Sequence, residues 1–142
     1  MAPKAYPAHC DCNNVEWTVT LDDDKQNHIL CHCNTCKRLS GAPYTLNQIV
    51  PSSAIKITKG EEGIKKYTYT GASGNPVHCY YCGNCTSHIY HHQTAMGPDT
   101  YIARTLMVDG GDQLKPSAEI FGKARLTWLP EVAKTFETVP PS

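Results

Sequence analysis

The stretch Cys31-His32-Cys33-Asn34-Thr35-Cys36 places three cysteines within six residues. These three, Cys31, Cys33 and Cys36, are called the triad below, and they offer a metal ion three thiolates with no obvious fourth ligand beside them. Sites that only hold a fold usually close all four positions around zinc with protein side chains, whereas reactive sites leave one position open. The rest of the chain is therefore expected to frame an incomplete ligand set.

Two further cysteine pairs lie on either side of the triad. A disulfide within Cys10-Asp11-Cys12 would be strained, because the Cα spacing and the S–S dihedral cannot both be satisfied between such close neighbours. Cys82-Gly83-Asn84-Cys85 is a C-x-x-C knuckle, whose glycine lets the backbone curl around a tetrahedral ion. The two pairs together predict a closed, structural zinc site that contributes directly to folding. Its ligands are Cys10, Cys12, Cys82 and Cys85.

That grouping leaves the triad to hold a second zinc ion, with water or an added thiol as the fourth ligand. An open zinc position lowers the pKa of a bound thiol or water and fixes it beside an electrophile, so the triad is predicted to be catalytic, in forming or breaking a carbon–sulfur bond. Two other groupings stay open. One joins Cys10 and Cys12 to two triad cysteines. The other closes the triad with a ligand drawn from Cys79, His32, His78 and His88.

Residues around the triad have plainer interpretations. Cys79 is expected to be a buried, small apolar side chain, with a spare ligand or a redox partner as the other possibilities. Lys37 and Arg38 directly follow the last triad cysteine, where they would lower a thiolate pKa, receive a substrate carboxylate, or simply lie in solvent. Only one of His91 and His92 would point inward from a strand. No catalytic role is predicted for the histidines, which are His9, His28, His32, His78, His88, His91 and His92.

Composition limits the class of protein. A chain of 142 residues suits a single domain over residues 1–142, with an ordered core over about 8–138. Thirteen basic residues balance thirteen acidic ones, which argues against nucleic acid as a partner. No apolar run predicts a membrane span or a secretory signal. We therefore expect a cytoplasmic protein, in which eight cysteines point to metal binding or catalysis rather than to disulfides.

Short segments separated by Gly, Pro, Asp or Ser turns predict a mainly β domain with little helix. Residues 1–9 are expected to be a loose lead-in and 139–142 a frayed tail. One helical turn is expected over 36–41, stopped by its glycine, and two more over 131–138, after a proline. The predicted strands are 15–21, 44–50, 55–58, 64–70, 77–81, 88–92, 101–108 and 119–126.

Three motifs in order, C-x-C, C-H-C-x-x-C-K-R-x-S-G and Y-C-x-x-C-x-S-x-I-Y, resemble the pattern of the glutathione-dependent formaldehyde-activating enzyme family, which also includes centromere protein V. In this chain they are Cys10 to Cys12, Cys31 to Gly41, and Tyr81 to Tyr90. Later echoes at Thr105-Leu106 and from Glu119 to Leu129 extend the resemblance over nearly the whole chain.

The resemblance implies coiled antiparallel β-sheets around zinc, with a structural ion shared by the C-x-C and C-x-x-C pairs and a labile catalytic ion on the triad. By position these are the same two cysteine sets as above. The reaction it implies joins the thiol of glutathione to formaldehyde, giving S-hydroxymethylglutathione, and its class is carbon–sulfur lyase. Two zinc ions, glutathione as a co-substrate and a small-molecule substrate are therefore expected.

The chain departs from the family pattern at a few positions. Cys85-Thr86-Ser87 stands where the family often has Cys-Gly-Ser, and Arg104-Thr105-Leu106-Met107 stands where it often has Gly-Thr-Leu-Asp. The arginine and the methionine are expected to reshape a pocket wall, and Cys79 lies outside the pattern. The leading hypothesis is a zinc-dependent carbon–sulfur lyase acting in specialised metabolism. The alternative is a non-catalytic, zinc-stabilised interaction module.

Overall fold

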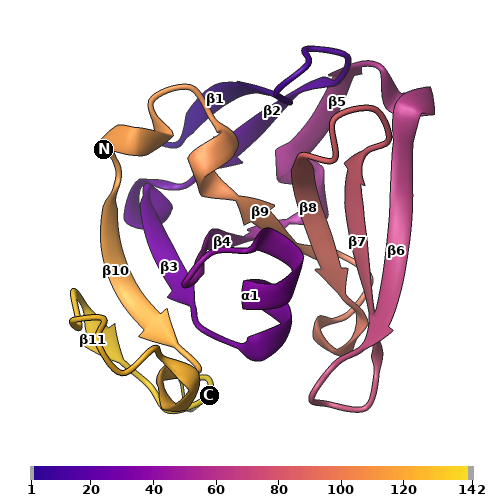
Figure 1. Ribbon diagram of the computed structural model, residues 1–142. Coiled ribbons are helices and arrows are strands. Elements are labelled where there is room, and N and C mark those ends of the chain that lie inside the picture. Colours follow the sequence, from indigo (N-terminus) through magenta and orange to yellow (C-terminus); the bar gives the residue numbers. More distant parts are fainter. Residues whose placement is uncertain (1, 141–142) are drawn as a thin grey trace.

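Two β-sheets and one α-helix make up most of the computed structural model, which describes residues 2–140 (Figure 1). The smaller sheet has the strand order β1-β2-β5, and the larger has the order β11-β10-β3-β4-β9-β8-β7-β6. The strands are β1 (Lys4–His9), β2 (Glu16–Leu21), β3 (Asn27–Cys31), β4 (Thr45–Pro51), β5 (Ile55–Lys59), β6 (Ile64–Thr70), β7 (Pro76–Cys82), β8 (His88–Gln93), β9 (Thr100–Arg104), β10 (Lys115–Ile120) and β11 (Lys134–Thr135).

The helical elements are short. The α-helix is α1 (Asn34–Ser40). Single 3-10 turns connect the strands, and they are η1 (Asp23–Lys25), η2 (Ser52–Ala54), η3 (Glu61–Gly63), η4 (Thr94–Met96), η5 (Thr105–Met107), η6 (Gly111–Gln113) and η7 (Gly122–Ala124). The expected mainly β class with little helix is therefore confirmed. The larger sheet is mixed rather than wholly antiparallel, because β10 pairs in parallel with both β3 and β11.

The hydrophobic core joins side chains from both sheets. Alternation along β2 turns Trp17, Val19 and Leu21 inward, as the sequence pattern predicts, and each is almost fully buried. They pack in one cluster with Val50 of β4 and Ala103 of β9. This core lies on one face of the larger sheet, so polar side chains can lie on the opposite face of that sheet.

α1 lies within the curve that the larger sheet makes from β10 round to β6 (Figure 1). The Sγ of Cys33 caps its first turn by accepting from the amide of Cys36. Gly41 ends it with φ 67°, a left-handed conformation that glycine adopts without steric cost. The helical turn expected over 36–41 therefore exists, begins slightly earlier, and stops at the predicted glycine.

The N-terminal expectation was wrong. Residues 4–9 are not a loose lead-in but the strand β1, which pairs along its length with β2. Pro7 is tolerated there because β1 is an edge strand, and an edge strand can lack one amide donor without breaking the sheet.

The C-terminal helix predicted over 131–138 was also wrong. The amides of Val132 and Ala133 donate to the buried carboxylate of Glu119, at 2.6 and 3.0 Å, and the chain then runs beside β10 as β11. A buried acceptor on another strand thus takes the amides that would have started a helix.

Two strand predictions were misplaced. The strand predicted over 119–126 lies at Lys115–Ile120 and ends where Phe121 turns to φ 54°. The strand predicted over 101–108 ends at Arg104. Of the predicted tail, residues 141–142 lie outside the described residues. Among residues 2–140, no helix has both the length and the apolar character to cross a membrane.

Candidate metal centres

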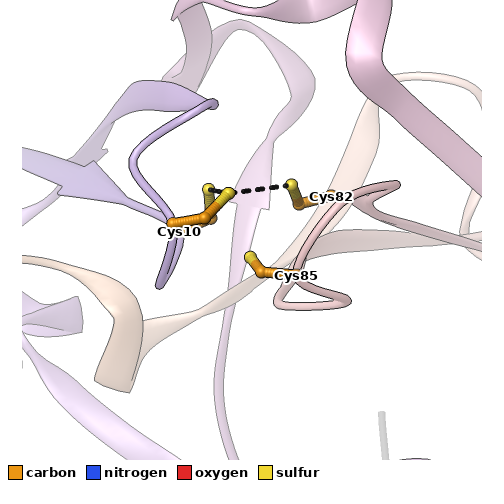
Figure 2. A group of neighbouring side chains, drawn as sticks. Cys10, Cys82 and Cys85 are labelled. Carbon is orange, nitrogen blue, oxygen red and sulfur yellow. Dashed lines mark hydrogen bonds between the residues drawn. The ribbon is translucent and has the colours of Figure 1, made fainter.

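Four cysteine side chains from two loops that are far apart in the sequence form the first cluster, called the closed cluster below. Cys10 and Cys12 follow β1, while Cys82 ends β7 and Cys85 lies in the loop before β8. Figure 2 shows the labelled side chains of Cys10, Cys82 and Cys85 pointing toward one another across the gap between these loops.

The two loops of the closed cluster share the same kind of backbone turn. In each, the residue directly after the second cysteine has a positive φ, 64° at Asn13 and 69° at Thr86. The amide of Asn13 donates to the carbonyl of Cys10, and the amide of Thr86 donates to that of Cys82. Each turn thereby brings its two thiols to the same side. Asparagine tolerates a left-handed conformation, whereas β-branched threonine does so only with strain.

The sulfur spacing of the closed cluster fits a tetrahedral zinc ion. The Sγ atoms of Cys10 and Cys12 lie 3.6 Å apart, and those of Cys12 and Cys82 lie 3.7 Å apart. Zinc–sulfur bonds of about 2.3 Å at tetrahedral angles separate sulfurs by about 3.8 Å. All four Sγ atoms lie within 4.8 Å of one another, and all four cysteines are unpaired. The closed cluster therefore offers a complete thiolate set for zinc.

The triad forms the second cluster. Cys31 ends β3, Cys33 caps α1, and Cys36 lies buried in the first turn of that helix. The Sγ atoms of Cys31 and Cys36 lie 3.4 Å apart, and the three Sγ atoms all lie within 4.8 Å of one another. Within residues 2–140, no fourth Cys, His, Asp or Glu joins this group. The triad can hold a metal ion with three sulfurs.

The candidates for a fourth ligand lie elsewhere. Cys79 on β7 is 2% exposed and stands outside the group. The Nε2 of His32 binds Glu119 at 2.7 Å, and the Nδ1 of His78 lies 2.7 Å from the hydroxyl of Thr68. His88 also stands outside the group. The structure thus brings together the two cysteine sets that the sequence grouped and does not close the triad with another side chain.

The pKa values of the triad thiols are shifted in different directions. Hydrogen bonds from Cys31 and Cys33 lower the pKa of the Cys36 thiol to about 2, helped by the hydroxyl of Thr45 and the positive charge of Arg104. The contacts with Cys33 and Cys36 raise the pKa of Cys31 far above its usual value. The contacts among the three sulfurs therefore favour deprotonation within the triad, and a metal ion bound by all three sulfurs would release the remaining protons.

Polar side chains from neighbouring strands surround the triad. Thr45 and Asn47 alternate on β4 so that both face the same side, and Arg104 of β9 lies opposite Asn47 in the sheet register. His91 of β8 is buried with an unpartnered Nδ1, and Tyr69 of β6 is half-buried. Apart from Arg104 and His91, the sequence reasoning did not single these residues out. The available signal was a buried strand with polar residues at every second position.

Burial raises the pKa of Tyr69, and the nearby sulfur of Cys36 raises it further. Its hydroxyl therefore stays protonated at neutral pH and can donate a hydrogen bond. Burial likewise raises the pKa of the Cys79 thiol, to about 11, which fits the expected small apolar role rather than that of a ligand.

The three basic residues singled out from the sequence, Lys37, Arg38 and Arg104, have different surroundings. Lys37 donates from Nζ to the carbonyl of Ala124 at 2.5 Å, and Arg38 is exposed. Arg104, expected to shape a pocket wall, is instead the buried cation that acts on Cys36. Met107, the other residue expected there, packs against the hydrophobic core.

His32 contacts Glu119 rather than the triad sulfurs, and it anchors the triad loop. Its Nε2 lies 2.7 Å from the Oε1 of Glu119, which also accepts from Arg125 at 3.0 Å. Burial raises the pKa of Glu119, but hydrogen bonds from the amide of Val132, His32 and Arg125 outweigh it and lower the value to about 2. An ionised, buried carboxylate thus ties the triad loop to the C-terminal segment.

Comparison with known proteins agrees with this architecture. The family model described as "Glutathione-dependent formaldehyde-activating enzyme" matches residues 5–124. An Emericella nidulans protein named "Putative glutathione-dependent formaldehyde-activating enzyme" is 30% identical over 82 residues, which cover 58% of this chain and 39% of that protein. The matched region is thus well under half of that relative's length.

A solved structure shares the fold. The crystal structure of a Rhodobacter sphaeroides protein superposes with a TM-score of 0.59 and 19% sequence identity, over 78% of this chain and 99% of that one. At this identity the likeness shows the fold alone. The family match covers most of the chain, and the chain therefore belongs to the glutathione-dependent formaldehyde-activating enzyme family.

Proposed function

We propose that this member of the glutathione-dependent formaldehyde-activating enzyme family is a zinc-dependent carbon–sulfur lyase that joins a thiol to a small electrophile, or runs the reverse reaction. The observation that carries the proposal is the triad, a group of three cysteine sulfurs with no fourth protein ligand among residues 2–140. Glutathione and formaldehyde, the compounds in the family's name, are the first thiol and electrophile to test.

The two clusters divide the work in this proposal. The closed cluster would hold a structural zinc through Cys10, Cys12, Cys82 and Cys85, and the triad would hold a catalytic one. When bound by three thiolates with one open position, zinc supplies Lewis acidity that lowers the pKa of an incoming thiol. The buried Cys36 and Cys31 keep water away from two of the three sulfurs.

The bond changes in the forward direction are simple. The thiol gives up its proton, its sulfur attacks the carbonyl carbon to form the C–S bond, and the carbonyl π pair moves to oxygen, which then takes a proton. A neutral donor beside the triad would stabilise that oxygen as charge develops. Tyr69 is the candidate for this donor, because its half-buried phenol is protonated at neutral pH and lies near enough to the triad for the triad sulfurs to raise its pKa.

The state of the cysteines supports a reducing setting for this chemistry. All eight are unpaired thiols, as expected of a cytoplasmic protein. We therefore extend the proposal to a cytoplasmic location, where a thiol co-substrate would also be kept reduced.

NMR exchange spectroscopy with ¹³C-formaldehyde and glutathione tests the proposal. The zinc-loaded protein should accelerate exchange between free formaldehyde and its S-hydroxymethyl adduct, and the Cys33→Ser variant should not. If the variant accelerates exchange as the wild type does, the triad is not the site. If neither does with any small thiol and aldehyde, the interaction-module alternative is the better account.

A further inference from the structure

Arg104 is a buried cation without a carboxylate partner among the described residues 2–140. Its side chain lies on β9, and the residue is 8% exposed. Within residues 2–140, no carboxylate oxygen lies within 4.0 Å of its guanidinium. Burying an unpaired charge is costly, and buried arginines are ordinarily matched by a carboxylate or another anion. The anion that balances Arg104 must therefore be something other than Asp or Glu.

A line of hydrogen bonds leads from Arg104 to the triad. Its Nη1 donates to the Oδ1 of Asn47, and the Nδ2 of Asn47 donates to the hydroxyl of Thr45 at 2.9 Å. Thr45 lies directly opposite Cys31 of the triad in the register of β4 with β3, and its hydroxyl contributes to lowering the pKa of the Cys36 thiol. Both hydrogen bonds donate in the direction of the triad, so the line turns the positive charge of Arg104 toward the triad sulfurs.

The other titratable groups around Arg104 supply no negative charge. Burial lowers the pKa of His91 to about 3 and also lowers that of His88, so both rings are neutral near pH 7. Burial keeps the Cys79 thiol protonated by raising its pKa to about 11. The remaining anion on this face would be the triad itself, because three thiolates around one zinc ion carry a net negative charge.

We propose that Arg104 is the counter-cation of the triad and acts on Cys36 through Asn47 and Thr45 as a positioning residue. The inference rests on the proposed function, because three thiolates exceed the charge of one zinc ion and leave the site negative. A thiolate as fourth ligand would add a further negative charge. Arg104 then favours an anionic sulfur ligand over a neutral one such as an amine.

The role of Arg104 is tested by the zinc affinity of the triad, measured by competition with a chromophoric chelator. Arg104→Gln should weaken it by about 10- to 100-fold, the usual effect of losing a group that supports a metal ligand. Arg38→Gln is the matched control, since it removes an equal but exposed charge near Cys36, and it should change affinity by about twofold or less because solvent screens it. Equal losses in the two variants would overturn the proposal.

Thr45→Val keeps the charge of Arg104 but removes the hydroxyl that accepts from Asn47. This variant tests the proposal independently if Arg104→Gln does not fold. With Co²⁺ on the triad, the sulfur-to-metal charge-transfer band should move to lower energy in Thr45→Val and Arg104→Gln and stay in place in Arg38→Gln. An unmoved band in Thr45→Val would overturn the line from Arg104 to Cys36. A wild type that binds only one zinc would overturn this inference and the proposed function together, whereas two zincs with an unchanged Arg104→Gln would overturn the inference alone.

Discussion

The closed cluster and the triad differ in what holds their cysteine loops in place. The closed cluster brings together segments 70 residues apart, and its Cys10 and Cys82 belong to the hydrophobic core. The triad comes from one short segment, whose loop is already held by the pairing of β3 with β4 and by the contact of His32 with Glu119. A loop held by strand pairing and by a side-chain contact does not need a fourth thiolate, which in the proposed function would leave one position of a bound zinc ion free for substrate.

The largest effect should come from removing one ligand of the closed cluster. In Cys82→Ser we expect loss of the folded state, because structural zinc contributes about 10 to 16 kcal/mol in small zinc domains and protein stability is only about 5 to 15 kcal/mol. Circular dichroism and zinc content of the purified variant measure this. A variant that melts at the wild-type temperature would show that the closed cluster does not hold the fold.

Glu119→Gln should be the next most damaging change, since it breaks the contacts that hold the triad loop. Leaving buried partners unpaired costs about 3 to 5 kcal/mol in the free energy of unfolding. Glu131→Gln is the control, because Glu131 is an exposed partner of the same Arg125 and should cost less than about 1 kcal/mol. Denaturant titration of both variants gives the comparison.

The pH dependence of the Glu119 effect follows from its pKa. The folded value, about 2, lies below the ordinary 4.5, so the stabilisation is complete above 4.5 and is lost as pH falls toward 2. The difference between wild type and Glu119→Gln should therefore stay constant between about pH 6 and pH 8. A difference that changed across that range would mean that the ionised carboxylate of Glu119 is not the source of the stabilisation.

Tyr69→Phe asks whether the open side of the triad does chemistry. Loss of one preorganised donor typically lowers kcat by about a hundredfold. Tyr67→Phe is the matched control, because Tyr67 lies two residues away on the same strand and is 49% exposed. Steady-state kinetics should show a fall in kcat for the first variant alone, and equal rates for both would remove Tyr69 from the proposed mechanism.

The smallest effect concerns the turn of the closed cluster. Thr86→Gly should stabilise the protein by about 1 kcal/mol, because glycine relieves the strain of a positive φ at a β-branched residue. Asn13→Gly should change stability by less, since asparagine already tolerates that conformation. Thermal melts of the two variants test this, and a destabilised Thr86→Gly would mean that the threonine side chain has a role of its own.

The sequence was most informative where local patterns act alone. Alternation and turn residues predicted β2 and the strands from β4 to β8, and cysteine spacing separated the two cysteine clusters that could each hold a metal ion. The two failures differ in cause, because β1 is an edge strand that pairs with the next strand β2 despite its proline, whereas the segment after Pro130 takes its structure from a buried carboxylate on β10. Val132 and Ala133 are extended since Glu119 accepts their amides, and nothing near them in the sequence signals this.

The candidate site shows the same limit. Its cysteines are local in sequence, whereas Thr45, Asn47, Tyr69 and Arg104 reach the triad only through strand order and register. Their chemistry therefore could not be assigned before the strands were placed. The lone arginine at the end of β9 was noticed as a departure from the family pattern, but its link to Cys36 required the fold.

The most direct test of the central claim, that the triad is a separate and open metal site, is the zinc stoichiometry of the reduced protein and of Cys33→Ser, measured together with a thermal melt. The account predicts two zinc ions in the wild type, one in the variant, and a variant that stays folded. A wild type with one zinc, or a Cys33→Ser variant that unfolds, would contradict it.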